Sequence, residues 1–186
     1  MDVATHAITL ISIIIGLGLT EMFGKLYRLI RNRRRVRWDF LPLAWVVTLF
    51  LLVLNFWWFL FLRLDASSQT GTVADFGLIL LPSILLFVAT ASVLPDFSGD
   101  EEWDMRRDYD EQRKVFILTF ALYQVSTFTT MLVVGRMDWD FLSVVRIAIL
   151  AVLVSMLLTN SRRWDWIAVG AIMIALLIRL TTQVVR

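Results

Sequence analysis

The sequence predicts an all-α, polytopic membrane protein with six transmembrane helices, a short cytoplasmic helix and both termini outside. Hydrophobic residues make up 59% of the 186-residue chain and charged residues only 18%, whereas about a quarter of the residues of a soluble domain are charged. The charges lie in short clusters between long apolar blocks. Because no second region differs in composition, we expect a single transmembrane domain over residues 1–186.

Six apolar blocks are long enough to cross the roughly 30 Å hydrocarbon layer of a membrane. They cover residues 6–29, 40–62, 76–95, 115–135, 141–159 and 165–184. The fifth and sixth blocks each contain an arginine, and only residues 160–164 separate them. A five-span protein, with one of these two blocks lying in the membrane interface, is therefore the alternative. The start MDVATHA lacks the basic region of a signal peptide, so we expect the first block to be retained.

The basic residues between the blocks predict the orientation. With the amino terminus outside, the inner loops hold eleven basic residues and the outer segments hold three. Lysine and arginine accumulate in cytoplasmic loops, so both termini should be outside. The inner residues are Arg31, Arg33, Arg34, Arg35, Arg37, Arg106, Arg107, Arg113, Lys114, Arg162 and Arg163, and the outer ones are Arg63, Arg136 and Arg186.

An aspartate next to aromatic residues marks four predicted helix starts. The aspartate can accept hydrogen bonds from the free amides of a first helical turn, and the aromatic side chains suit the depth of the lipid headgroups. We expect each aspartate to cap the helix that follows it. The four are Asp39, Asp75, Asp140 and Asp165.

The segment 96–114 is the longest polar piece of the chain. A capping box and two ion pairs at i,i+4 spacing predict a helix over about 99–114, either separate from the fourth span or continuous with it. The capping box is Ser98 with Glu101, and the pairs are Glu102 with Arg106 and Asp110 with Lys114.

This segment and the first inner loop carry opposite charges. Residues 96–114 contain eight acids and four bases, a net charge of −4, whereas residues 31–37 carry +5. The two segments should lie on the same side of the membrane and can dock against each other. The alternative is that Arg31, Arg33, Arg34, Arg35 and Arg37 bind anionic lipid, at about 1 kcal/mol per basic residue, or a protein partner.

Four small residues form a predicted packing ridge on the first span. Ser12, Gly16, Thr20 and Gly24 recur every fourth residue and so share one side of a helix. Small residues at this interval allow another helix backbone to approach closely. The ridge predicts a homo-oligomer packed through the first helix, unless it is a small-residue face without a partner.

Several polar side chains fall inside the predicted spans, where they are costly and merit a functional hypothesis. They could line a route for an ion or small solute. The alternatives are a structural ion pair of Glu21 with nearby bases, arginines that reach the headgroups, and hydroxyls that bond between helices. The residues are Glu21, Asn55, Tyr123, Gln124, Thr127, Arg146 and Arg179.

No catalytic or cofactor-binding pattern accompanies these residues. The chain has no cysteine and a single histidine, His6, which argues against a thiolate or multi-histidine metal site. We find no P-loop, dinucleotide fingerprint or nucleophile motif. We therefore expect no enzyme activity, no metal, no cofactor and no nucleic-acid partner.

The run GLGLTEMFGKLYRLIRNRRRVRWDFLPLAW, followed by NFWWF, resembles small uncharacterised bacterial inner-membrane proteins. The resemblance covers mainly the first two spans and implies a multi-pass protein of the bacterial inner membrane. It implies no activity and no functional residue.

Two functions remain open at this point. The first is a small channel or transporter-like protein for an ion or small solute, with the intramembrane polar residues along the route. The second is a non-transporting scaffold or accessory subunit that binds a protein partner or anionic lipid through its cytoplasmic loops.

Overall fold

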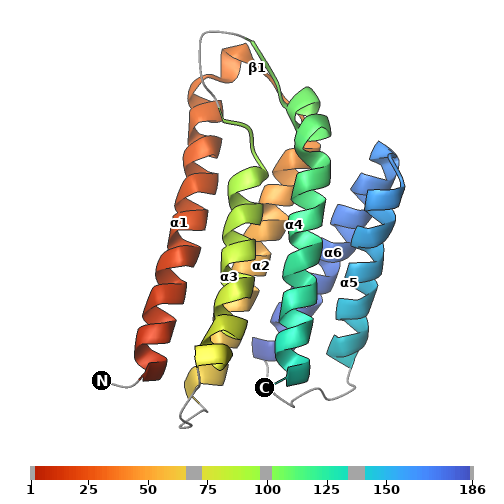
Figure 1. Cartoon of the computed structure of the whole chain (residues 1–186). Helices are drawn as coiled ribbons and strands as arrows, with labels where there is room; N and C mark the ends of the chain where they lie inside the picture. Colours follow the sequence, from red (N-terminus) through yellow and green to blue (C-terminus); the bar gives the residue numbers. More distant parts are fainter. Residues whose placement is uncertain (1–2, 66–72, 97–101, 134–140, 185–186) are drawn as a thin grey trace.

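Six α-helices form one bundle in the computed structural model, which describes residues 3–65, 73–96, 102–133 and 141–184. The helices are α1 (Val3–Arg31), α2 (Phe40–Asp65), α3 (Val73–Ser92), α4 (Met105–Val133), α5 (Phe141–Leu158) and α6 (Arg162–Val184). A 3₁₀ turn, η1 (Arg33–Arg35), and two short strands, β1 (Val36–Arg37) and β2 (Trp103–Asp104), complete the described elements. Both chain termini lie at the end of the bundle opposite β1 (Figure 1). We call these two ends the termini end and the sheet end.

The all-α prediction is confirmed, and each predicted span falls on one helix. Among the described residues, four helices are long and apolar enough to cross a membrane: α1, α2, α4 and α6. The apolar stretches of α3 and α5 are shorter, at Phe76–Ser92 and Ser143–Leu158. These helices indicate a membrane protein.

Neighbouring helices pack in a regular order. α1 packs on α3, α3 on α4, α4 on α5, and α2 on α6. Trp45 of α2 is fully buried and packs against two phenylalanines of α4. Its ring meets those of Phe116 and Phe120 edge to face, with centroids 5.2 and 6.0 Å away. Such pairs add about 0.5–1.5 kcal/mol each to the burial itself.

Of the three glycines of α1, Gly18 lies against another helix, and the small-residue ridge does not include it. A Cβ built on Gly18 would lie 2.6 Å from Thr90 Oγ1 and 3.3 Å from the Cα of Phe87, both in α3. Cβ atoms at Gly16 and Gly24 would meet nothing within 4 Å. Within the described chain the predicted ridge of Ser12, Gly16, Thr20 and Gly24 therefore does not hold a second helix. Its use between two copies of the chain stays a prediction.

The predicted docking of the basic and acidic segments is confirmed. β1 and β2 pair in parallel, with Val36 opposite Trp103 and Arg37 opposite Asp104. The Arg37 guanidinium lies 3.7 Å from the Glu102 carboxylate, which adds an ion pair to the backbone pairing. The opposite net charges of the two segments thus predicted their contact, and the strand pairing determines which residues meet.

The helix expected over about 99–114 is not a separate element. α4 begins at Met105, directly after β2, and continues without a break into the fourth span. Asp104 caps it, because its Oδ1 accepts hydrogen bonds from the amides of Arg106 and Arg107 at 3.0 and 3.3 Å. The predicted capping box of Ser98 and Glu101 lies outside the described residues. The predicted start was wrong because Trp103 and Asp104 pair with β1, and Asp104 is then the cap of the helix that follows.

Candidate functional site

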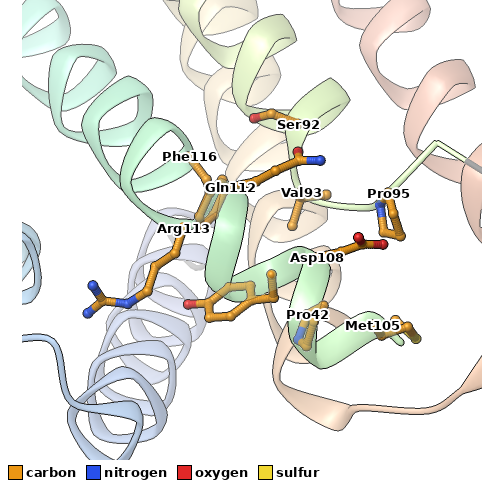
Figure 2. Close-up of a pocket in the computed structure, with 10 residues that line it drawn as sticks. Pro42, Ser92, Val93, Pro95, Met105, Asp108, Gln112, Arg113 and Phe116 are labelled. Atoms are coloured by element: carbon orange, nitrogen blue, oxygen red, sulfur yellow. The ribbon is translucent and has the colours of Figure 1, made fainter. Parts of the chain in front are cut away.

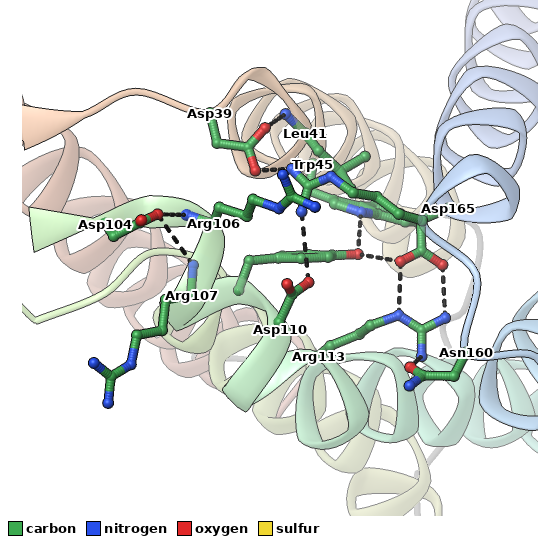
Figure 3. A network of polar contacts seen from close by, with 12 residues as sticks. Asp39, Leu41, Trp45, Asp104, Arg106, Arg107, Asp110, Arg113, Asn160 and Asp165 are labelled. Atoms are coloured by element: carbon green, nitrogen blue, oxygen red, sulfur yellow. Dashed lines mark hydrogen bonds and ion pairs between the residues drawn. The ribbon is translucent and has the colours of Figure 1, made fainter.

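The most deeply buried charges of the described chain lie at the sheet end. Arg113 of α4 faces Asp165 of α6 through two hydrogen bonds (Figure 3). Arg113 Nε donates to Asp165 Oδ2 at 2.6 Å, and Arg113 Nη2 donates to Oδ1 at 2.7 Å. The two side chains are only 5% and 1% exposed. This two-point geometry is the strongest form of an arginine–carboxylate pair.

The Arg113 guanidinium also binds the carboxyl-terminal end of α5. Its Nη2 donates to the carbonyl oxygens of Met156 and Thr159, both at 2.9 Å. Its Nη1 lies 3.4 Å from Asn160 Oδ1. The last carbonyls of a helix lack partners within the helix and carry partial negative charge. One guanidinium therefore joins α4, α5 and α6.

Tyr109 and Trp45 extend the pair to α2. The Tyr109 hydroxyl donates to Asp165 Oδ2 at 3.3 Å and accepts a hydrogen bond from Trp45 Nε1 at 3.1 Å. All of these groups are buried. We call Trp45, Tyr109, Arg113 and Asp165 the sheet-end network. It leaves no net charge, because one arginine is matched by one carboxylate.

A second arginine, Arg162, makes further ion pairs next to the sheet-end network. Arg162, the first residue of α6, pairs with Asp39 and lies 3.5 Å from Asp110 of α4. Asp39 also accepts a hydrogen bond from the amide of Leu41 at 3.2 Å, so it caps α2 as predicted. The ion pairs at this end thus connect helices that are far apart in the sequence.

The sequence did not predict the roles of Arg113 and Asp165. Arg113 was counted only as a basic residue of an inner loop, and Asp165 as the cap of the sixth span. The second prediction is wrong, because α6 begins at Arg162 and Asp165 lies inside its first turn, facing α4. The only sequence signal was the four-residue spacing of Tyr109 and Arg113, which places both on one side of a helix. The corresponding cap positions Asp75 and Asp140 lie outside the residues whose side chains are described.

Glu21 lies in an ion-pair cluster between α1 and the end of α3. Its carboxylate is 3.7 Å from Lys25 Nζ and 3.8 Å from Arg28 Nη2. Asp96 approaches the same two bases at 3.5 and 3.7 Å. The buried Lys25 ammonium also donates to the carbonyl oxygen of Ala91 at 2.7 Å. This geometry is the structural ion pair that the sequence offered as the alternative, and a role for Glu21 in permeation stays a prediction.

The polar residues predicted in the middle of the bundle are mostly buried, and the hydroxyls bond to backbone. Thr127 Oγ1 donates to the Gln124 carbonyl of its own helix at 2.9 Å. Thr130 Oγ1 lies 2.8 Å from the carbonyl oxygen of Leu78 in α3, a bond between helices. Asn55 is 2% exposed, and its Nδ2 has no hydrogen-bond partner in the described structure. The Thr130 hydroxyl thus makes a bond between helices, the Thr127 hydroxyl bonds only its own helix, and Asn55 has an unsatisfied amide.

Tyr123 connects two of the remaining predicted residues. The buried Tyr123 of α4 lies within electrostatic range of Arg146 in α5 and Arg179 in α6. Its ring also contacts that of Phe56 in α2, with centroids 6.1 Å apart. Arg146 touches Met131, and both arginines are partly buried. The fold therefore places Arg146 and Arg179, from two different helices, near Tyr123, and a role of the three in permeation stays a prediction.

The basic segment is exposed at the sheet end. Arg31 ends α1, and η1 presents the next three arginines to the surroundings. Arg37 is held by Glu102, as described above. Arg31, Arg33 and Arg34 have no acidic side chain within 4 Å among the described residues.

A cavity of about 10 Å³ lies between α2, α3 and α4 next to the sheet-end network (Figure 2). Its lining includes Pro42, Ser92, Asp108 and Arg113. The volume is about that of one water molecule, which is too small for a substrate. Asp108 Oδ2 is buried there and accepts no hydrogen bond within the described parts of the chain.

Over the same described parts, no cluster of three or more metal-binding side chains occurs. The chain matches no protein-family model, and neither the curated proteins nor the solved structures contain a significant match to it.

Proposed function

We propose that this protein is a non-conducting, multi-pass scaffold or accessory subunit of the bacterial inner membrane, with no enzymatic activity of its own. In this proposal all six helices cross the membrane, the sheet end faces the cytoplasm and both termini are outside. The common end of the two termini supports an even number of crossings (Figure 1). The basic residues of the sheet end support its cytoplasmic position.

The sheet-end network is the observation that carries the proposal. A route along the bundle between α2, α4, α5 and α6 would have to pass Trp45, Tyr109, Arg113 and Asp165. These side chains are buried and bonded to one another and to the end of α5. The pair is neutral and desolvated, so it offers no free charge to a passing ion. Four helices joined in this way suit a rigid support better than a conduit.

The docked segments supply the binding face of such a scaffold. The β1–β2 pairing and the Arg37–Glu102 ion pair hold the basic segment 31–37 at a defined place on the sheet end. A preorganised surface loses less conformational entropy when a partner binds. The scaffold would thus present this face at the cytoplasmic side of the membrane.

A flux measurement tests the proposal. Purified protein in liposomes should give no proton, potassium or chloride flux above that of empty liposomes. The absence of cysteine allows a topology test beside it. A Ser68→Cys variant should react with an impermeant maleimide on intact cells, and a Gln112→Cys variant only after permeabilisation. Flux through the wild-type protein would refute the scaffold, and the opposite labelling pattern would refute the orientation.

The channel or transporter-like function is the second candidate, and a specific observation favours it. Tyr123, Arg146 and Arg179 belong to three different helices, and the two arginines lie within electrostatic range of Tyr123. In this alternative the sheet-end network is the closed end of a route. Flux that disappears in Arg146→Ala and Glu21→Gln would support it.

A further inference from the structure

The arginines of the sheet end divide into two groups by their partners. Five have carboxylate partners among the described residues: Arg28 with Glu21 and Asp96, Arg37 with Glu102, Arg107 with Glu111, Arg113 with Asp165, and Arg162 with Asp39 and Asp110. Arg31, Arg33 and Arg34 are exposed and have no such partner among the described residues. Arg106 and Arg163 are also exposed and lack such a partner in the described parts of the chain, but they lie singly on α4 and α6. Arg31, Arg33 and Arg34 lie within four positions of one another, so they concentrate positive charge in one turn.

The backbone fixes these three residues in a short turn. The amide of Asn32 donates to the Arg28 carbonyl at 3.1 Å, and the amide of Arg35 donates to the Asn32 carbonyl at 2.9 Å. The Asn32 side-chain amide adds a hydrogen bond to the same Arg28 carbonyl at 2.9 Å. The turn then enters β1, which is paired with β2. The guanidinium groups therefore project from a defined backbone.

Exposed aromatic side chains flank the turn on both sides. Tyr27 precedes it on α1, and Trp38 and Phe40 follow it at the start of α2; their exposed fractions are 63, 41 and 72%. Tyrosine and tryptophan favour the interface between hydrocarbon and water, at the level of the headgroups. The turn between them therefore lies at the depth of lipid phosphates, where a soluble partner has less access.

We propose that Arg31, Arg33 and Arg34 form a binding site for the headgroup of an anionic phospholipid, with Tyr27, Trp38 and Phe40 setting its depth. This site deepens the proposed scaffold function and rests on it for the orientation of the sheet end. Guanidinium groups bind phosphate oxygens through paired hydrogen bonds, which distinguishes them from a diffuse positive field.

The test compares binding of phosphatidylglycerol and phosphatidylcholine with identical acyl chains to the full-length protein in detergent, by native mass spectrometry. The wild type should prefer phosphatidylglycerol. Each basic residue contributes about fivefold in affinity, so the Arg31→Gln/Arg33→Gln/Arg34→Gln variant should lose about 100-fold of that preference. The matched control, Arg106→Gln/Arg107→Gln/Lys114→Gln, removes the same charge from the same end and should lose less than fivefold.

Further variants keep the test decisive. The corresponding triple lysine variant keeps the charge and should stay within about tenfold of the wild type. An unchanged preference in the glutamine variant, or an equal loss in the control, would overturn the site. So would binding of an acidic peptide by the wild type without any preference between the two lipids. Flux in liposomes together with an intact lipid preference would refute the scaffold function and leave the lipid site standing.

Discussion

Replacing Arg113 with methionine should destabilise the bundle far more than any surface substitution. Among the described residues, the change leaves the two buried oxygens of Asp165 with a single donor, the Tyr109 hydroxyl at 3.3 Å. It also removes the donor to the carbonyls of Met156 and Thr159 at the end of α5. Removal of one partner from a buried ion pair costs about 3–5 kcal/mol, because the other charge stays buried and uncompensated. We expect the free energy of unfolding to fall by that amount.

The chain offers a matched control in the same helix. Arg107 pairs with Glu111 at 3.0 Å, but both side chains are mostly exposed. Exposed pairs of this kind contribute at most about 1 kcal/mol, so Arg107→Met should have a small effect. The double variant Arg113→Met/Asp165→Leu should recover most of the loss, because apolar residues of similar volume replace a buried ion pair at little cost.

Reversible unfolding in mixed detergent micelles, followed by tryptophan fluorescence, measures these differences. The double-mutant cycle then isolates the coupling between Arg113 and Asp165. An Arg113→Met variant within 1 kcal/mol of the Arg107→Met control would contradict the reasoning. A double variant whose loss equals the sum of the two single losses would show that the buried charges are not coupled.

The same unfolding assay checks three further predictions. Gly18→Ala should lower the free energy of unfolding by about 1–3 kcal/mol, because the added methyl group overpacks against α3. Gly16→Ala has open space around it and should not destabilise the monomer. Equal effects of the two changes would contradict the α1–α3 contact. Asn55→Leu should stabilise the protein by about 1–3 kcal/mol, because it removes a buried amide without an acceptor. A loss of stability would indicate that Asn55 has a polar partner. Trp45→Phe should cost about 1 kcal/mol for the hydrogen bond to the Tyr109 hydroxyl, and no change would argue against that bond.

The positions of the helices were predictable because they depend on local composition. Each predicted span falls on one helix, and the charge difference between residues 31–37 and 96–114 predicted their docking. The start of α4 was predicted wrongly, because Trp103 and Asp104 pair with the distant β1 and Asp104 then caps the helix.

The pairing of the polar residues also depends on distant contacts, and it was harder to predict. Glu21 was recognisable as a charge among bases, because Lys25 and Arg28 follow it at helical spacing. Arg113 and Asp165 are 52 positions apart, and no sequence periodicity relates them. Their partnership depends on which sides of α4 and α6 face each other after packing.

The sequence alone determined that this is an all-helical chain with membrane-spanning character, because apolar length and charge clustering are read residue by residue. It also determined which segments carry opposite charge. Only the tertiary structure decided which charges are neutralised, which glycine meets another helix and which arginines are left for a ligand. The physical reason is that burial and pairing depend on the contacts between helices, and these contacts join residues that are distant along the chain.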